Sequence, residues 1–225
     1  MYGPYCGAKQ AGAGADIADI DGNGIPDLAL MVVEDLEGAN AFRYRIGWNL
    51  DASGMPASWS DGIRLPGLGW ENSGGGMALG DLDGNGTSEM VLMAIDNPEG
   101  HNHVWYTVVQ LDQTGRPKSM TSMLRTPFDL GDSSAGGGAA LADVDGNGKL
   151  DLVLVNIDSP QGANPFWGQI GWDIDINGNV ARWSSFVGPA LGNMTSGGGA
   201  AIGDIDMDGI VDLLLMTVDD PYGKD

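Results

Sequence analysis

An acidic, glycine-rich loop recurs four times in this chain of 225 residues, and its spacing constrains the fold more than any other feature. The copies begin at Asp19, Asp81, Asp143 and Asp204, so successive copies are 62, 62 and 61 residues apart. A fixed period of this length is typical of arrays in which each repeat is one supersecondary unit packed on its neighbours. We therefore predict a single domain over 1–225, made of an N-terminal tail (1–11), full repeats at 12–73, 74–135 and 136–196, and a partial repeat at 197–225.

Each full repeat carries four strand-like segments. A run of small residues such as SGGGMALG (73–80) precedes the loop, and a run of large apolar residues such as MVLMAI (90–95) follows it. An aromatic segment and a shorter fourth segment complete the repeat. Glycine and alanine at this density suit strands that crowd around a common axis. These features predict an all-β fold, a β-propeller of four repeats with the loop between the first two strands of each blade. A β-roll needs a period of about nine residues, which the chain lacks.

The loops follow the pattern D-x-D-G-N-G-x-x-D, with oxygen-bearing side chains at positions 1, 3, 5 and 9 and a glycine at position 6 that permits a sharp bend. Hard oxygen ligands in a flexible loop suit Ca²⁺, whereas Mg²⁺ prefers a smaller octahedral site and Zn²⁺ prefers His or Cys. The pattern predicts about four calcium ions. Their side-chain ligands are Asp19, Asp21, Asn23 and Asp27; Asp81, Asp83, Asn85 and Glu89; Asp143, Asp145, Asn147 and Asp151; and Asp204, Asp206, Asp208 and Asp212. Backbone oxygens of Ile25, Thr87, Lys149 and Ile210 complete the predicted sites.

The loops differ from an EF-hand at position 12, where a bidentate Glu is expected and this chain has Leu30, Leu92, Leu154 and Leu215. Thirteen of the 31 acidic residues lie in the four loops. Four bound divalent ions would add eight positive charges and change the formal charge of the chain from −21 to −13. We expect the metal-free chain to be much less stable because the loop carboxylates then repel one another. The fourth loop, with three acids at positions 1, 3 and 5, should depend most on its ion.

At these loops the chain resembles the FG-GAP/VCBS family of calcium-binding repeats, which includes integrin-like β-propellers. The resemblance covers nearly the whole chain and rests on DxDGNGxxD between a Gly/Ala strand and a Leu/Val strand. It implies a propeller with structural calcium in these loops, used outside the cell for adhesion, binding or scaffolding. Propellers of the family commonly have seven blades, and the four motifs of this chain depart from that number.

The fourth repeat ends at Asp225, where the third segment begins in the other repeats, so its blade lacks the outer hairpin. The apolar run 213–218 then lies at an open edge that can pair with another chain. One expectation is head-to-tail assembly of identical chains into filaments or tubes. The alternative, of equal weight, is that the short C-terminal segment folds back on its own chain.

Composition excludes several classes of partner. Ten basic against 31 acidic residues leave no basic face for nucleic acid or an anionic membrane, and no apolar run is long enough to span a membrane. Cys6 is the only cysteine, so no intrachain disulfide forms; a free thiol is favoured over a cross-link between chains. Residues 1–10 do not resemble a signal peptide. We nevertheless expect an extracellular or cell-surface location, with any signal removed, because calcium modules of modest affinity are common there.

These features favour a non-enzymatic calcium-binding structural or adhesive module whose partners are other copies of itself, glycans or cell-surface proteins. The alternative is a carbohydrate-binding propeller, suggested by tryptophans that recur at matching positions: Trp48 and Trp172, Trp105 and Trp167, Trp59 and Trp183. Repeated aromatics more often pack between blades. An enzyme is least favoured, because His101 and His103 are the only histidines and no Ser or Cys has a recognisable nucleophile setting.

Overall fold

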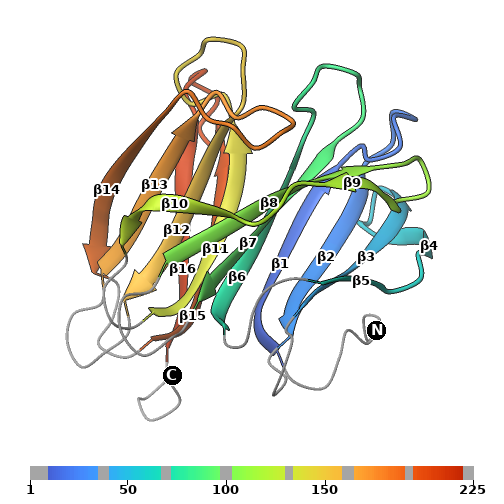
Figure 1. The fold of residues 1–225 in the computed structure, drawn as a ribbon. Coiled ribbons are helices and arrows are strands. Elements are labelled where there is room, and N and C mark those ends of the chain that lie inside the picture. Colours follow the sequence, from blue (N-terminus) through green and yellow to red (C-terminus); the bar gives the residue numbers. More distant parts are fainter. Residues whose placement is uncertain are drawn as a thin grey trace.

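A computed structural model of the chain describes residues 10–34, 41–66, 72–96, 103–129, 134–158, 165–190 and 195–219 (Figure 1). Sixteen strands make up the regular structure of this part of the chain, and they form four antiparallel sheets. The all-β, antiparallel prediction is therefore confirmed. Within the described ranges, no helix is long and apolar enough to cross a membrane.

Each sheet is built from one consecutive stretch of chain. The first strands are β1 (Gln10–Ala18), β6 (Asn72–Gly80), β11 (Ser134–Ala142) and β15 (Thr195–Gly203). The second strands are β2 (Asp27–Glu34), β7 (Glu89–Asp96), β12 (Asp151–Asp158) and β16 (Asp212–Asp219). The third strands are β3 (Ala41–Leu50), β8 (His103–Leu111) and β13 (Pro165–Trp172). The outer strands are β4 (Pro56–Trp59) and β5 (Ile63–Pro66), β9 (Pro117–Met120) and β10 (Leu124–Asp129), and β14 (Arg182–Ala190).

The fourth segment of the repeat is one strand in the third sheet but two short strands in the first and second, which the sequence did not predict. At each break a side-chain hydroxyl accepts a backbone N–H of the third strand, whereas Ser184, which matches Ser60 in the unbroken β14, accepts the Trp172 Nε1–H. The N–H of Ile46 donates to Ser60 Oγ at 2.9 Å, and the N–H of Val108 donates to Thr121 Oγ1 at 3.1 Å. A side chain thus takes the place of a carbonyl in the ladder, and the strand is interrupted there.

The sheets stack face to face in chain order through their first strands, and glycine makes this close approach possible (Figure 1). A methyl group added at Gly14 would lie 2.7 Å from the backbone nitrogen of Met77. One added at Gly76 would lie 2.7 Å from backbone atoms of Gly138 and Ala139. Only a residue without a side chain allows two backbones to approach this closely.

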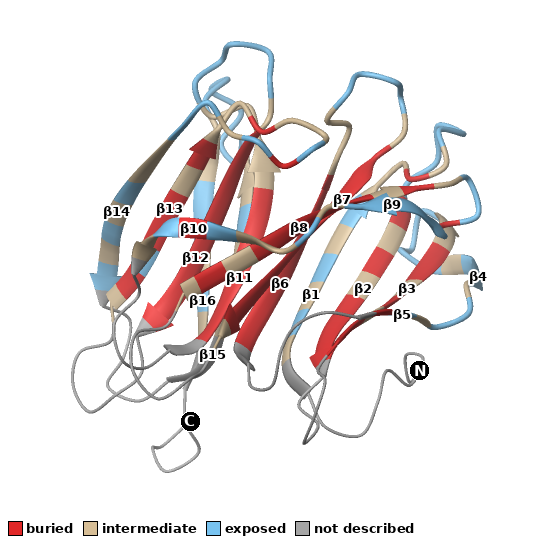
Figure 2. Ribbon diagram, in the orientation of Figure 1, coloured by how far each residue is buried: buried red, intermediate tan, exposed pale blue. Residues whose placement is uncertain are grey.

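Every sheet has two faces, which we name by direction along the chain. The N-side face points toward the preceding sheet, and the C-side face points toward the following one. On the second strands the N-side faces carry Leu28 and Leu30, Met90 and Leu92, Leu152 and Leu154, and Leu213 and Leu215. The C-side faces carry Ala29 and Met31, Val91 and Met93, Val153 and Val155, and Leu214 and Met216. The apolar core lies where a C-side face meets the next N-side face, and Figure 2 shows it as buried segments in β6, β7, β11 and β12.

Two tyrosines join the outer parts of neighbouring sheets. The hydroxyl of Tyr44 in the first sheet donates to the Gly115 carbonyl in a turn of the second sheet at 2.8 Å, and Tyr106 donates to the Gly178 carbonyl of the third sheet at 2.8 Å. Burial raises the pKa of Tyr106 to about 12, and it raises the pKa of Tyr44 as well. Both hydroxyls therefore keep their protons and remain donors.

The stack is open at its two ends among the described residues. Contacts of comparable extent join β1 to β6, β6 to β11 and β11 to β15, but none of this extent joins β15 or β16 to β1. The fourth sheet consists of β15 and β16 in the described part of the chain. The closure of four blades into a ring, and the single-domain boundary at 1–225, stay predictions.

Candidate metal centre

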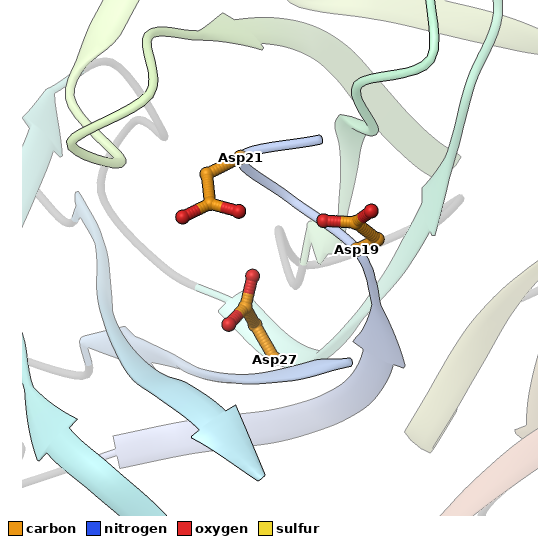
Figure 3. A group of neighbouring side chains, drawn as sticks. All are labelled: Asp19, Asp21 and Asp27. Atoms are coloured by element: carbon orange, nitrogen blue, oxygen red, sulfur yellow. The ribbon is translucent and has the colours of Figure 1, made fainter. Parts of the chain in front are cut away.

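The structure brings three carboxylates together in each acidic loop. Their oxygens lie within 4.8 Å of one another in the groups Asp19, Asp21 and Asp27; Asp81, Asp83 and Glu89; Asp143, Asp145 and Asp151; and Asp204, Asp206 and Asp212. Figure 3 shows the three side chains of the first loop pointing toward a common space. Each group can hold one metal ion. The residues at positions 1, 3 and 9 of every predicted site are thus brought together.

The backbone of each loop turns twice through the left-handed region. Position 6 is Gly24, Gly86, Gly148 or Gly209, with φ between 85° and 88°. Position 4 also needs a positive φ, which the sequence prediction did not include: Gly22, Gly84 and Gly146 have φ near 75°. In the fourth loop position 4 is Met207, which adopts φ 63° although it has a Cβ, so this loop carries strain that the others avoid.

Backbone N–H groups hold the carboxylates at positions 1 and 3. In the first loop, Asp19 accepts the N–H of Asn23 at 3.0 Å and of Gly24 at 2.7 Å, and Asp21 accepts the N–H of Asn23 at 3.1 Å. The same three bonds occur in the other loops. These bonds fix the carboxylates in place before any ion binds, which reduces the cost of ordering them.

The side chain at position 5 faces the backbone of its own loop. Its Oδ1 atom accepts the N–H of the residue at position 7, at 2.8 Å in the first loop, and the same bond recurs in every loop. In the fourth loop, Asp208 makes this bond to Ile210, while the group of three converging acids comprises Asp204, Asp206 and Asp212. The role of the position-7 carbonyl oxygens of Ile25, Thr87, Lys149 and Ile210 stays a prediction.

The carboxylate at position 9 closes the loop. It belongs to the first residue of the second strand and accepts the N–H of the residue at position 2, for example Ile20 to Asp27 at 3.1 Å and Val144 to Asp151 at 2.8 Å. Asp27 and Asp151 are fully buried. Backbone N–H donors do not neutralise the charge of a buried carboxylate. A bound cation would neutralise it and so stabilise the ionised form.

Two supporting residues were missed by the sequence prediction. Asn49 and Asp173 stand at the ends of the third strands with φ near 54°, and their N–H groups donate to Asp27 and Asp151 at 2.8 Å. Their side chains also accept the amide of the position-5 asparagine, at 2.9 Å from Asn23 and 2.8 Å from Asn147. They orient the loop ligands from a second layer.

A difference in spacing marks these two positions. Gly47 and Asp51 are four residues apart, as are Gly171 and Asp175, whereas the equivalent Val109 and Asp112 are three apart. The second repeat therefore has no residue at the Asn49 position. Its loop instead has Glu89, one methylene longer than aspartate, whose Oε2 accepts the Leu82 N–H at 2.9 Å. The longer acid and the missing support thus occur in the same repeat. The one-residue difference in spacing was the sequence signal that could have identified the two supporting residues.

Replacing Asn49 separates its backbone role from its side-chain role. We expect Asn49→Ala to lower the free energy of unfolding by about 1 kcal/mol more than Asn49→Gly, because both lose the Asn23 bond but only alanine resists a positive φ. Urea denaturation in calcium measures the difference. Equal losses in the two variants would show that the left-handed conformation carries no cost here.

Burial acts against the charged form of several carboxylates in the ion-free protein. It raises the pKa of Asp27 and of Glu89, and the neighbouring loop aspartates raise both further, while backbone N–H donors act in the opposite direction. Burial also raises the pKa of Asp16 on β1, whose carboxylate accepts the Leu79 N–H of the next sheet at 2.7 Å. A bound cation would favour the ionised form of the two loop acids.

The direction of these pKa shifts predicts that the unfolding temperature depends on pH in opposite ways with and without bound metal. A carboxyl whose pKa is raised by folding stabilises the folded state when protonated, and this contribution is lost as the pH rises through the folded pKa. The unfolding temperature of metal-free protein should therefore rise as the pH falls from neutral to about 5, above the ordinary carboxyl range. In excess calcium it should fall over the same interval, because protons compete with the ion. Parallel slopes in the two series would contradict this.

The other predicted candidates lie apart from the loops. Trp48 and Trp183 pack against the apolar core, and the Trp105 Nε1–H donates to Asp96 at 2.8 Å. Trp59 and Trp167 are each more than a third exposed. His103 lies beside Asp96 and Arg125 at the start of β8. Cys6 and His101 lie outside the described residues.

No family model, curated protein or solved structure matches the chain. The chemistry of the loops therefore has to be inferred from their own donors, which are carboxylate, amide and backbone oxygens at four equivalent places.

Proposed function

We propose that the chain is a non-enzymatic calcium-binding β-propeller that acts as a structural or adhesive module outside the cell. The observation that carries the proposal is the convergence of three carboxylates in each of four equivalent loops. Because the convergence recurs with the same backbone bonds, it belongs to the repeat and not to one specialised site. The resemblance to FG-GAP/VCBS repeats supports the same function.

Calcium is favoured by the donors. The groups contain only aspartate and glutamate, with asparagine or aspartate oxygens and backbone carbonyls at hand, so hard ions are preferred over zinc. Glycines at positions 4 and 6 let the loop adjust to the long and irregular bonds of Ca²⁺, whereas Mg²⁺ demands a compact octahedron.

The position of the loops supports a structural role for the ions. Each loop joins the first strand of a sheet to its second strand, and the first loop also touches the next sheet, where Ser88 Oγ donates to the Asp19 carbonyl at 3.1 Å. An ion in the loop fixes the two innermost strands relative to each other. It thereby supports the surface on which the next sheet packs.

A propeller is supported by the stacking of sheets in chain order through glycine-rich first strands. The acids with converging oxygens recur with the repeat, which favours ligands over a unique catalytic pair. The tryptophans that pack in the core or hydrogen-bond within the chain support packing roles over a glycan platform.

Calorimetric titration of metal-free protein tests the proposal. We expect four calcium ions per chain, three for Asp151→Asn, and four for Asp61→Asn, which removes the same charge from an exposed position outside the loops. Magnesium should displace little calcium at equal concentration. Absence of calcium binding, or a preference for zinc, would contradict the proposal.

A further inference from the structure

In the described part of the chain, the two ends of the stack leave complementary faces uncovered. On the C-side face of the fourth sheet, Leu214 is 56% exposed and Met216 is 58% exposed. On the N-side face of the first sheet, Ile17 is 56% exposed, and Leu28 and Leu30 are only partly buried. Figure 2 shows exposed and intermediate residues on β1 and on β16.

The same positions are buried where two full sheets meet. The counterparts of Leu214 and Met216 on the C-side faces are at most 2% exposed: Ala29 and Met31, Val91 and Met93, Val153 and Val155. On the N-side faces of the second and third sheets, the counterparts of Leu28 and Leu30 are at most 1% exposed: Met90 and Leu92, Leu152 and Leu154. On the N-side face of the two-stranded fourth sheet, Leu213 is 38% exposed. Three internal contacts between sheets thus show how a C-side face packs on an N-side face. The C-side face of the fourth sheet and the N-side face of the first sheet make no such contact among the described residues.

Gly199 fits a fourth contact of the same kind. It is equivalent to Gly14, Gly76 and Gly138, where a methyl group would lie 2.5 to 2.7 Å from the backbone of the next sheet. At Gly199 the nearest atom to such a methyl is Met216 Cε at 3.6 Å, an ordinary contact. Among the residues that the structure describes, none requires glycine at this position, whereas a sheet packed on this face as in the other three contacts would require it.

The third strands of the first and third sheets suit contact with a neighbour that has only two strands. Gly168 of the third sheet occupies the position of Tyr44 and Tyr106, and its neighbouring space is filled by Phe186. The tyrosines reach the turn between the third strand and the outer strand of the next sheet, and the described fourth sheet has no such strands to form one. On β3, Arg45 stands where the second and third sheets have the buried Thr107 and Gln169. A charged residue is suited to a place that a two-stranded sheet leaves open to water.

We propose that the C-side face of the fourth sheet binds the N-side face of the first sheet in a second copy of this chain, and so repeats the contact already made three times within the chain. The inference rests on the proposed structural function and specifies its partner. The contact joins faces and not the free edge of β16. It is heterologous, so it produces a closed ring or an open filament according to the rotation between copies.

Lysine substitutions on each face test the proposal by sedimentation velocity in excess calcium. Met216→Lys blocks the C-side face and Ile17→Lys blocks the N-side face, and each should weaken self-association at least about tenfold, because a charge would be buried in an apolar contact. Val187→Lys is the matched control, since Val187 is 59% exposed on the outer strand β14 and belongs to neither face. Gly199→Ala should also block assembly without destabilising the monomer.

Mixing the two lysine variants gives the decisive result. Each retains the face that the other has lost, so an equimolar mixture should form a dimer that grows no further. The proposal is overturned if the unaltered chain stays monomeric, if either variant assembles like the unaltered chain, if Val187→Lys also blocks assembly, or if the mixture remains monomeric. A monomer in which Leu214 and Met216 are protected from solvent would mean that the chain closes on itself.

The calcium titration separates this inference from the proposed function. A monomer that binds four ions would remove the contact and leave the calcium module standing. Assembly of a chain that binds no calcium would do the reverse.

Discussion

Removal of calcium is expected to lower the midpoint of thermal unfolding by at least about 20 °C. A site held at a hundred times its dissociation constant contributes about 2.7 kcal/mol, so four independent sites contribute about 11 kcal/mol. In a domain of this size each kcal/mol corresponds to about 2–4 °C. This figure includes the repulsion that an ion relieves among the three carboxylates of each loop, whose oxygens lie within 4.8 Å of one another.

Differential scanning calorimetry with calcium and with a chelator measures this shift. Magnesium at the same ionic strength is the control, because it reproduces the screening of surface charge without filling a calcium site well. Recovery of the midpoint with calcium but not with magnesium is the expected result. An unfolding midpoint that is the same in calcium and in chelator would show that the loops do not stabilise the fold through an ion.

The second large effect is expected for Gly138→Ala, which should lower the free energy of unfolding by about 3 kcal/mol or more. The new methyl would lie 2.5 Å from the backbone nitrogen of Ala200 and 3.1 Å from the backbone of Gly199. The neighbouring atoms belong to a strand backbone, so no flexible side chain can move aside. The third and fourth sheets would have to separate.

Gly199→Ala is the matched control, because the same methyl group meets only the end of the Met216 side chain. We expect a change within about 1 kcal/mol and of stabilising sign, since alanine restricts the unfolded chain. Both substitutions are best compared in the Ile17→Lys background, where the contact between copies is blocked, Met216 is retained and urea denaturation reports on the monomer alone. Equal losses at the two positions would contradict the close packing of the first strands.

The strands and the carboxylate groups could be predicted from sequence because both depend on local pattern. Gly/Ala runs, Leu/Val runs and the D-x-D-G-N-G-x-x-D spacing recur in every repeat, and the structure places strands and converging acids at those positions. The alternation within a loop is sufficient to bring positions 1, 3 and 9 together, because the positive φ at positions 4 and 6 determines how the loop bends, even where position 4 is Met207.

What the sequence could not provide depends on contacts between distant segments. The bond from Ile46 to Ser60 Oγ divides an outer strand, yet a serine in a strand-like run gives no sign of it. Asn49 supports the first loop from 22 residues beyond Asp27, and only an offset between repeats marks it. The packing of sheet on sheet is likewise invisible in a single repeat, since it is the neighbour that buries Met31 or Met93.

All four acidic loops lie at the same end of the stacked sheets (Figure 1). Thirteen of the 31 acidic residues are therefore collected on one rim, which concentrates negative charge there in the ion-free molecule. Four calcium ions would cancel eight of those thirteen charges. Near a positively charged surface the empty molecule would therefore turn its loop rim toward that surface and be held tightly, whereas the filled molecule would be released at lower salt. Retention on an anion exchanger thus becomes a direct measure of how many loops are occupied.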